Sequence, residues 1–179
     1  MERIFIIGYM GSGKTTIGKR LAKLLSLSFV DLDAYIENKY RKTISALFAE
    51  KGEEGFRKIE NRSLQEVAAF EDVIISTGGG TPCFFNNMEI MNGTGLTIYL
   101  QAHPEDLADH LLDSKTVRPL IAGKSREQLI PFITEHLEQR EYYYRKAQVI
   151  YPIDRMITKD EINLTVRSVG EELKKRSTK

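Results

Sequence analysis

A glycine-rich stretch near the start of the chain limits what this sequence can fold into more than any other feature. Residues 8–15 read Gly-Tyr-Met-Gly-Ser-Gly-Lys-Thr and match the pattern G-x-x-x-x-G-K-[ST]. An apolar run at 4–7 precedes them, and a segment with helical spacing of apolar residues, 14–25, follows. The pattern therefore predicts a loop that joins a strand to a helix and binds phosphate with its backbone N–H groups.

The side chains at the end of this loop indicate a nucleoside triphosphate as the ligand. Lys14 is expected to reach the β- and γ-phosphates and to act in catalysis, and the Thr15 hydroxyl to bind a bridging Mg²⁺ ion. A turn that only caps a helix would explain the glycines but neither Lys14 nor Thr15. The expected nucleotide-binding residues are Gly11, Ser12, Gly13, Lys14, Thr15 and Thr16.

Short apolar runs alternate with segments of helical period along most of the chain. Runs of this kind, separated by helices, are typical of a parallel sheet that is covered on both faces. We therefore expect a three-layer α/β/α fold with a central five-stranded parallel sheet, and ligands at the carboxyl ends of its strands. The expected strands lie at 4–7, 29–30, 73–75, 96–100 and 149–151.

Composition excludes several classes of protein. With 179 residues, of which 41% are hydrophobic and 28% charged, the chain suits a single domain over residues 1–179. Its formal net charge of +1 favours neither nucleic acid nor a membrane surface as a partner. A single cysteine, no signal-peptide pattern and no long apolar run lead us to expect a cytoplasmic protein, and a monomer is expected.

Two carboxylates follow the second expected strand, at the edge where ligands should bind. Asp31 and Asp33 could divide the work, one holding metal-bound water and the other accepting a proton from an attacking alcohol or orienting it. An Asp directly after a strand also suits the N-cap of the next helix. Both interpretations stay open from the sequence.

Two further segments suit the binding of a small acid. Arg57 and Glu60 are spaced to share one helix face, so Glu60 could hold a guanidinium that grips a carboxylate, or the two could form an exposed salt bridge. Residues 76–82, Ser-Thr-Gly-Gly-Gly-Thr-Pro, follow the third expected strand, and their glycines permit a ligand to approach the backbone closely. Residues 113–123 have no apolar period and are expected to form a mobile lid.

Together these positions resemble the shikimate kinases, which share the fold of the nucleoside monophosphate kinases. The resemblance covers residues 4–151. It rests on an ordered set of motifs, which are residues 8–15, Asp31-Leu32-Asp33, the spaced residues Ile44, Phe48, Gly52, Glu53, Phe56, Arg57 and Glu60, then 78–80, Arg118-Pro119-Leu120, and Arg140 with Tyr144.

The resemblance implies transfer of the ATP γ-phosphate to the 3-hydroxyl of shikimate, a step of aromatic amino-acid biosynthesis. It implies that Asp33 contacts the acceptor hydroxyls, that Arg57 and Arg140 hold the carboxylate, and that Gly79 and Gly80 donate backbone hydrogen bonds. A helical segment at about 32–62 would bind this acceptor.

On the nucleotide side, the resemblance implies that Asp31 and Ser76 hold Mg²⁺-bound water and that Arg118, on the lid, reaches the transferring phosphate. Many members carry a second arginine shortly before the lid, where this chain has Leu111-Leu112-Asp113-Ser114. ATP, Mg²⁺ and shikimate are thus the expected ligands.

Two other functions stay open from the sequence. A related small-molecule kinase would act on gluconate or a nucleoside monophosphate, although the latter would need a base pocket that the sequence does not indicate. A nucleotide-binding module without catalysis would be expected to lack Asp33, Arg57 and Arg140 together.

Overall fold

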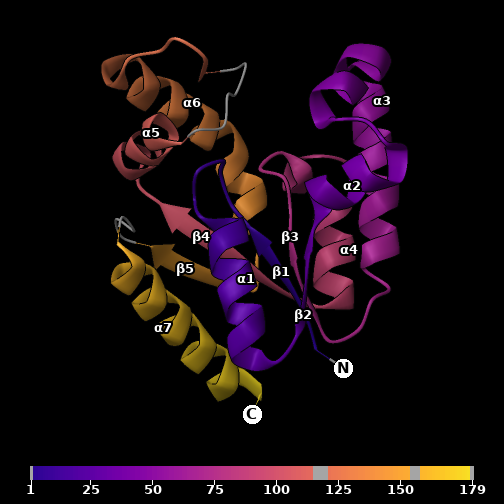
Figure 1. Cartoon of the computed structure of the whole chain (residues 1–179), viewed down its shortest axis with the longest axis vertical. Helices are drawn as coiled ribbons and strands as arrows, with labels where there is room; N and C mark the ends of the chain where they lie inside the picture. Colours follow the sequence, from indigo (N-terminus) through magenta and orange to yellow (C-terminus); the bar gives the residue numbers. More distant parts are fainter. Residues whose placement is uncertain (1, 115–120, 154–157, 178–179) are drawn as a thin grey trace.

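The computed structural model describes residues 2–114, 121–153 and 158–177. At least one helix separates each strand from the next along the chain (Figure 1). In chain order they are β1 (Arg3–Ile7), α1 (Lys14–Leu25), β2 (Ser28–Asp31), α2 (Leu32–Tyr40), α3 (Ile44–Val67), β3 (Val73–Ser76), the 3₁₀ turn η1 (Thr81–Cys83), α4 (Asn87–Thr94), β4 (Leu96–Ala102), α5 (Pro104–Asp113), α6 (Arg126–Tyr144), β5 (Val149–Ile153) and α7 (Lys159–Ser177).

The described strands form one five-stranded sheet in the order β2-β3-β1-β4-β5, and all paired neighbours are parallel. Strand β1 lies at the centre and pairs with β3 on one side and β4 on the other. This confirms the expected parallel sheet and its strands. The loop after β1 therefore lies between the loops that follow its two neighbours.

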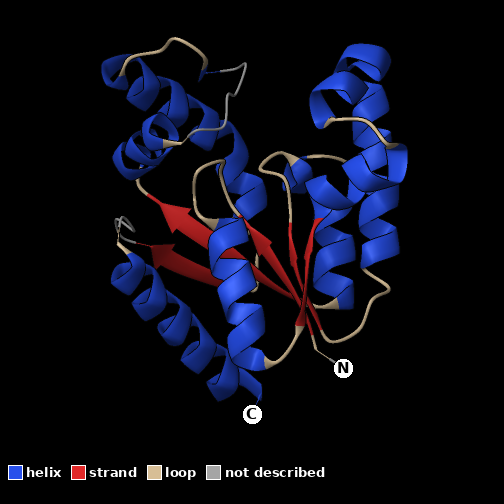
Figure 2. Ribbon diagram, viewed as in Figure 1, coloured by secondary structure: helices blue, strands red, loops and turns tan. Residues whose placement is uncertain are grey.

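Alternate side chains of the strands pack against different helices. Ile4, Ile6 and Ile74 face one layer together with buried residues of α1 and α7. Phe5 and Ile75 face the opposite layer, where buried residues come from α2 to α6. Figure 2 shows the sheet between these two helical layers. Both faces are buried, which confirms the expected α/β/α architecture.

The expected lid at 113–123 begins one residue too early. Asp113 is the last residue of α5 rather than part of a loop, because the helix continues through it. Residues 115–120, and with them Arg118, lie outside the described residues. Among the helices that the structure describes, none is both long and apolar enough to cross a membrane.

Helix α3 contains a kink at Gly52, which has φ 67° and ψ −179°. This backbone conformation is strained for any residue with a Cβ atom. No heavy atom lies within 4 Å of the place where a Cβ would be, so only the backbone opposes a side chain there. Arg57 lies on the part of α3 that follows this kink.

We predict that Gly52→Ala lowers the free energy of unfolding by about 1 kcal/mol, because alanine must adopt a positive φ. Gly93→Ala is the matched control, since Gly93 is helical and an added Cβ also meets nothing. It should leave stability unchanged or raise it by about 0.5–1 kcal/mol. Chemical denaturation measures both values, and equal effects would contradict the strain at Gly52.

Candidate active site

The loop after β1 has the geometry of a phosphate-binding loop. Gly13 caps α1 with φ 79°, a conformation that glycine adopts without cost, and Lys14 is the first residue of the helix. The Lys14 Nζ donates a hydrogen bond of 2.8 Å to the carbonyl oxygen of Tyr9, and the side chain is buried. The loop thus brings a positive charge and a helix N-terminus to one point.

Asp31 caps the next helix, which is one of the two interpretations that its sequence position allowed. Its Oδ1 accepts a hydrogen bond from the Ala34 N–H and caps α2. Its Oδ2 accepts one of 2.8 Å from the Thr15 hydroxyl. Ser76 pairs in register with Asp31 on the neighbouring strand, so both side chains face the layer that contains α1. The sheet therefore places Thr15, Asp31 and Ser76 close together.

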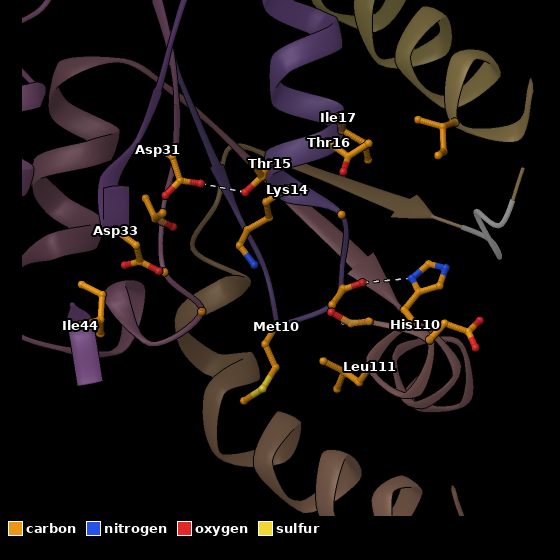
Figure 3. Close-up of a pocket in the computed structure, with 18 of the residues that line it drawn as sticks. Met10, Lys14, Thr15, Thr16, Ile17, Asp31, Asp33, Ile44, His110 and Leu111 are labelled. Carbon is orange, nitrogen blue, oxygen red and sulfur yellow. Dashed lines mark hydrogen bonds between the residues drawn. The ribbon is translucent and has the colours of Figure 1, made fainter. Parts of the chain in front are cut away.

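A cleft of about 740 Å³ opens over these residues. Figure 3 shows the Lys14 and Asp33 side chains extending into the same space. The predicted site residues that line the cleft are Gly11, Gly13, Lys14, Thr15, Thr16, Asp31, Asp33 and Gly79. The other described ones do not line it, and they are Ser12, Arg57, Ser76, Gly80 and Arg140.

Asp33 has an environment that favours its protonated form. Burial and the neighbouring carboxylates of Asp31 and Glu60 raise its pKa to about 6, although Lys14 acts in the opposite direction. A carboxyl group with such a pKa is a better proton acceptor than an ordinary surface aspartate. It is also still largely ionised at neutral pH.

Arg57 and Glu60 form a buried ion pair rather than an exposed one. The Arg57 Nη1 donates a hydrogen bond of 2.9 Å to Glu60, whose side chain is only 1% exposed. The other Glu60 oxygen accepts a hydrogen bond of 2.7 Å from the Thr81 hydroxyl. Glu60 thus fixes the guanidinium on α3 and ties it to the turn that follows β3.

The glycine loop at 78–80 is held by hydrogen bonds to all its carbonyl groups. Gly78 accepts from the Thr81 N–H, Gly79 from the Tyr144 hydroxyl at 2.6 Å, and Gly80 from the Cys83 N–H. A Cβ atom on Gly79 would lie 3.2 Å from the Met10 backbone nitrogen. This loop therefore packs directly against the phosphate-binding loop.

Arg140 approaches the glycine loop from α6. Its guanidinium lies 5.6 Å from the centre of the Tyr9 ring. Burial raises the pKa of the Cys83 thiol to about 11, while the positive charges of Arg140 and Arg57 lower it. Arg57 lies beside the same loop, since a Cβ atom on Gly80 would lie 2.6 Å from the Arg57 Nη2.

Two histidines near the site, and the contacts that two motif tyrosines make, were not predicted from the sequence. His110 lines the cleft, with Nδ1 3.0 Å from the Gly11 carbonyl oxygen. The Tyr9 hydroxyl lies 3.0 Å from His136 Nδ1, and Tyr144 reaches Gly79. A single histidine or tyrosine forms no sequence pattern that would indicate a role. Its position near the site becomes visible only when the fold brings distant segments into contact.

Comparisons with known proteins agree with this geometry. The family profile described as "Shikimate kinase" matches residues 10–169. The chain belongs to the shikimate kinase family. A shikimate kinase from Parabacteroides distasonis is 54% identical over 163 residues, which cover 91% of this chain and 94% of that protein.

Two solved structures of family members extend the comparison. The crystal structure of shikimate kinase from Bacteroides thetaiotaomicron has a TM-score of 0.93 and 47% identity, and the match covers 97% of this chain and 98% of that one. Shikimate kinase from Acinetobacter baumannii in complex with shikimate has a TM-score of 0.80 and 30% identity, with 98% and 94% covered. The expected family and fold are confirmed.

We predict that Asp33→Asn stabilises the fold at pH 8. The raised pKa means that Asp33 contributes stability below about pH 4, and that this contribution is lost as the pH rises through 6. The amide should therefore raise the free energy of unfolding by about 1–3 kcal/mol at pH 8 and by much less at pH 4. Denaturation at the two pH values measures this, and a loss of stability at pH 8 would contradict the raised pKa.

Proposed function

We propose that the protein transfers the γ-phosphate of ATP to the 3-hydroxyl of shikimate, giving shikimate 3-phosphate and ADP. The observation that carries the proposal is the placement of Lys14 and Asp33 in one cleft, with a buried arginine on α3 beside it. Family membership supports the same reaction. Phosphoryl transfer needs charge neutralisation and positioning more than covalent chemistry, and these residues supply both.

On the nucleotide side, the loop N–H groups and Lys14 would bind the phosphates. The donor set fits Mg²⁺, because the Thr15 hydroxyl and the Asp31 carboxylate are oxygen ligands that lie 2.8 Å apart. Thr15 would bind the ion directly, and Asp31 and Ser76 would bind its water. When bound, the ion supplies positive charge at the β- and γ-phosphates.

On the acceptor side, Arg57 and Arg140 would hold the carboxylate of shikimate, and Gly79 and Gly80 would donate backbone hydrogen bonds. Asp33 would orient the 3-hydroxyl and accept its proton as the oxygen attacks the γ-phosphorus. The bond between the γ-phosphorus and the bridging oxygen of ADP breaks in the same step. Arg118, which lies outside the described residues, is proposed from the family resemblance to neutralise the transferring phosphate.

A coupled assay of ADP release over shikimate, gluconate and nucleoside monophosphates tests this function. We expect release that depends on shikimate and little with the others, because two arginines suit a small carboxylate. Release driven by gluconate or a nucleotide would identify another kinase. Nucleotide binding without any acceptor-dependent release would identify a non-catalytic module.

We predict that Lys14→Ala abolishes detectable turnover and leaves the fold intact, because Lys14 neutralises phosphate charge. Lys23→Ala is the control, since Lys23 is exposed on the last turn of the same helix. It should keep normal activity. A folded Lys14→Ala protein with full activity would remove the phosphate-binding assignment.

We predict that Arg57→Ala and Arg140→Ala each raise the Kd for shikimate about thirtyfold or more, and change that for ATP little. Lysine at either position should restore only part of the affinity, because an ammonium group lacks the two-pronged geometry. Arg62→Ala, an exposed change on α3, is the control. Calorimetry measures each Kd, and loss of ATP affinity alone would contradict the carboxylate role.

A further inference from the structure

We propose that Phe84 is a positioning residue whose ring holds the Arg57 guanidinium in the orientation that grips the carboxylate of the acceptor. The inference rests on the proposed function, because it concerns the same acceptor. Phe84 directly follows η1, while Arg57 lies on α3, so the contact joins two separate elements. The motif set that marks the family does not include Phe84.

The Phe84 ring is the nearest aromatic group to this guanidinium. Its centre lies 4.0 Å from the Arg57 Cζ, whereas the rings of Phe48 and Phe56 lie at 5.5 and 5.4 Å. A cation that close to a ring is attracted by the negative charge of the π face, and more strongly where water is excluded. The Arg57 side chain is only 11% exposed, so water is largely excluded here.

The remaining contacts leave two guanidinium nitrogens without a short hydrogen bond to the described residues. Nη1 is bound to the buried Glu60. Nη2 has a longer contact of 3.6 Å with Glu53, whose side chain is 64% exposed, and Nε is buried without a hydrogen-bond partner among the described residues. Nε and Nη2 lie on the same edge of the planar group, and such an edge can donate two parallel hydrogen bonds to the oxygens of a carboxylate.

Other atoms keep the guanidinium from turning away from this orientation. A Cβ atom on Gly80 would lie 2.6, 2.9 and 3.0 Å from Nη2, Nη1 and Cζ, so the Gly80 backbone lies close to the whole guanidinium. The Phe84 ring lies against the guanidinium 4.0 Å from its centre. Without the ring, the long arginine side chain would gain rotamer freedom that binding must remove again.

The backbone around Phe84 is built to direct this ring inward. Phe84 is extended, and the next residue, Phe85, has φ 49°, which is unfavourable for an aromatic residue. As a result Phe85 is 57% exposed, while Phe84 contacts Arg57. The Asn87 amide donates to the Thr81 carbonyl and accepts from Asn61 on α3, both at 2.7 Å, which ties the turn to the helix.

The experiment compares Phe84→Leu with its neighbour Phe85→Leu. Phe84→Leu should raise the Kd for shikimate about three- to tenfold by calorimetry, with the Kd for ATP and kcat within about twofold of wild type. Phe85→Leu should match wild type, and Phe84→Tyr, which retains a ring, should restore most of the affinity. If Phe84→Leu does not fold, Phe84→Met takes its place, because methionine fills a similar space without a π face.

Two further measurements separate positioning of Arg57 from ordinary packing. The methyl ester of shikimate lacks the carboxylate charge, so Phe84→Leu should weaken its binding much less than that of shikimate. In an Arg57→Ala background, Phe84→Leu should cause little additional loss, because the residue that it positions is absent. Equal loss for acid and ester, or additive losses in the double variant, would overturn the proposal.

The outcomes also distinguish this inference from the proposed function. If wild type phosphorylates shikimate while Phe84→Leu has a normal Kd for it, only the role of Phe84 is wrong. If wild type neither binds nor phosphorylates shikimate, the proposed function fails, and the inference fails with it.

Discussion

A parallel sheet that is buried on both faces binds its ligands at the carboxyl ends of its strands, where the loops carry polar groups. Because β1 is central, the loop with Lys14 has the segments that follow β3 and β2 on one side and the segment that follows β4 on the other. The Thr15 hydroxyl therefore reaches Asp31, and Gly79 packs against the Met10 backbone. The nucleotide and acceptor halves of the site thus depend on the strand order of one sheet.

The acceptor half depends on one buried carboxylate, that of Glu60. Such a charge is tolerated in the interior only when each oxygen has a partner, and here Arg57 and Thr81 provide them. The negative charge of Glu60 also contributes to the raised pKa of Asp33. Glu60 therefore acts on both residues that are proposed to bind the acceptor. It orients Arg57 and increases the proton affinity of Asp33.

The fold and much of the site could be predicted because their signals are local. The spacing of glycines before Lys14 and the apolar runs depend on neighbouring residues only, and the family motifs indicated Arg57 and Arg140 as acceptor-binding residues. Whether Arg57 is exposed could not be predicted, since its burial comes from Phe84 and Gly80 on another element. The contacts of Tyr9 with Arg140 and of Tyr144 with Gly79 could not be predicted either, because each joins two separate elements.

Charge is distributed unevenly along the cleft, and this suits the proposed reaction. Lys14 and the N-terminus of α1 lie where phosphate would bind, while the carboxylates of Asp31 and Glu60 raise the pKa of Asp33. Lys14 opposes that effect, because its positive charge lowers the pKa of Asp33. A phosphate bound to Lys14 would neutralise part of this charge and add a negative one nearby. Binding of the nucleotide would therefore make Asp33 a stronger base at the stage when the attacking hydroxyl must lose its proton.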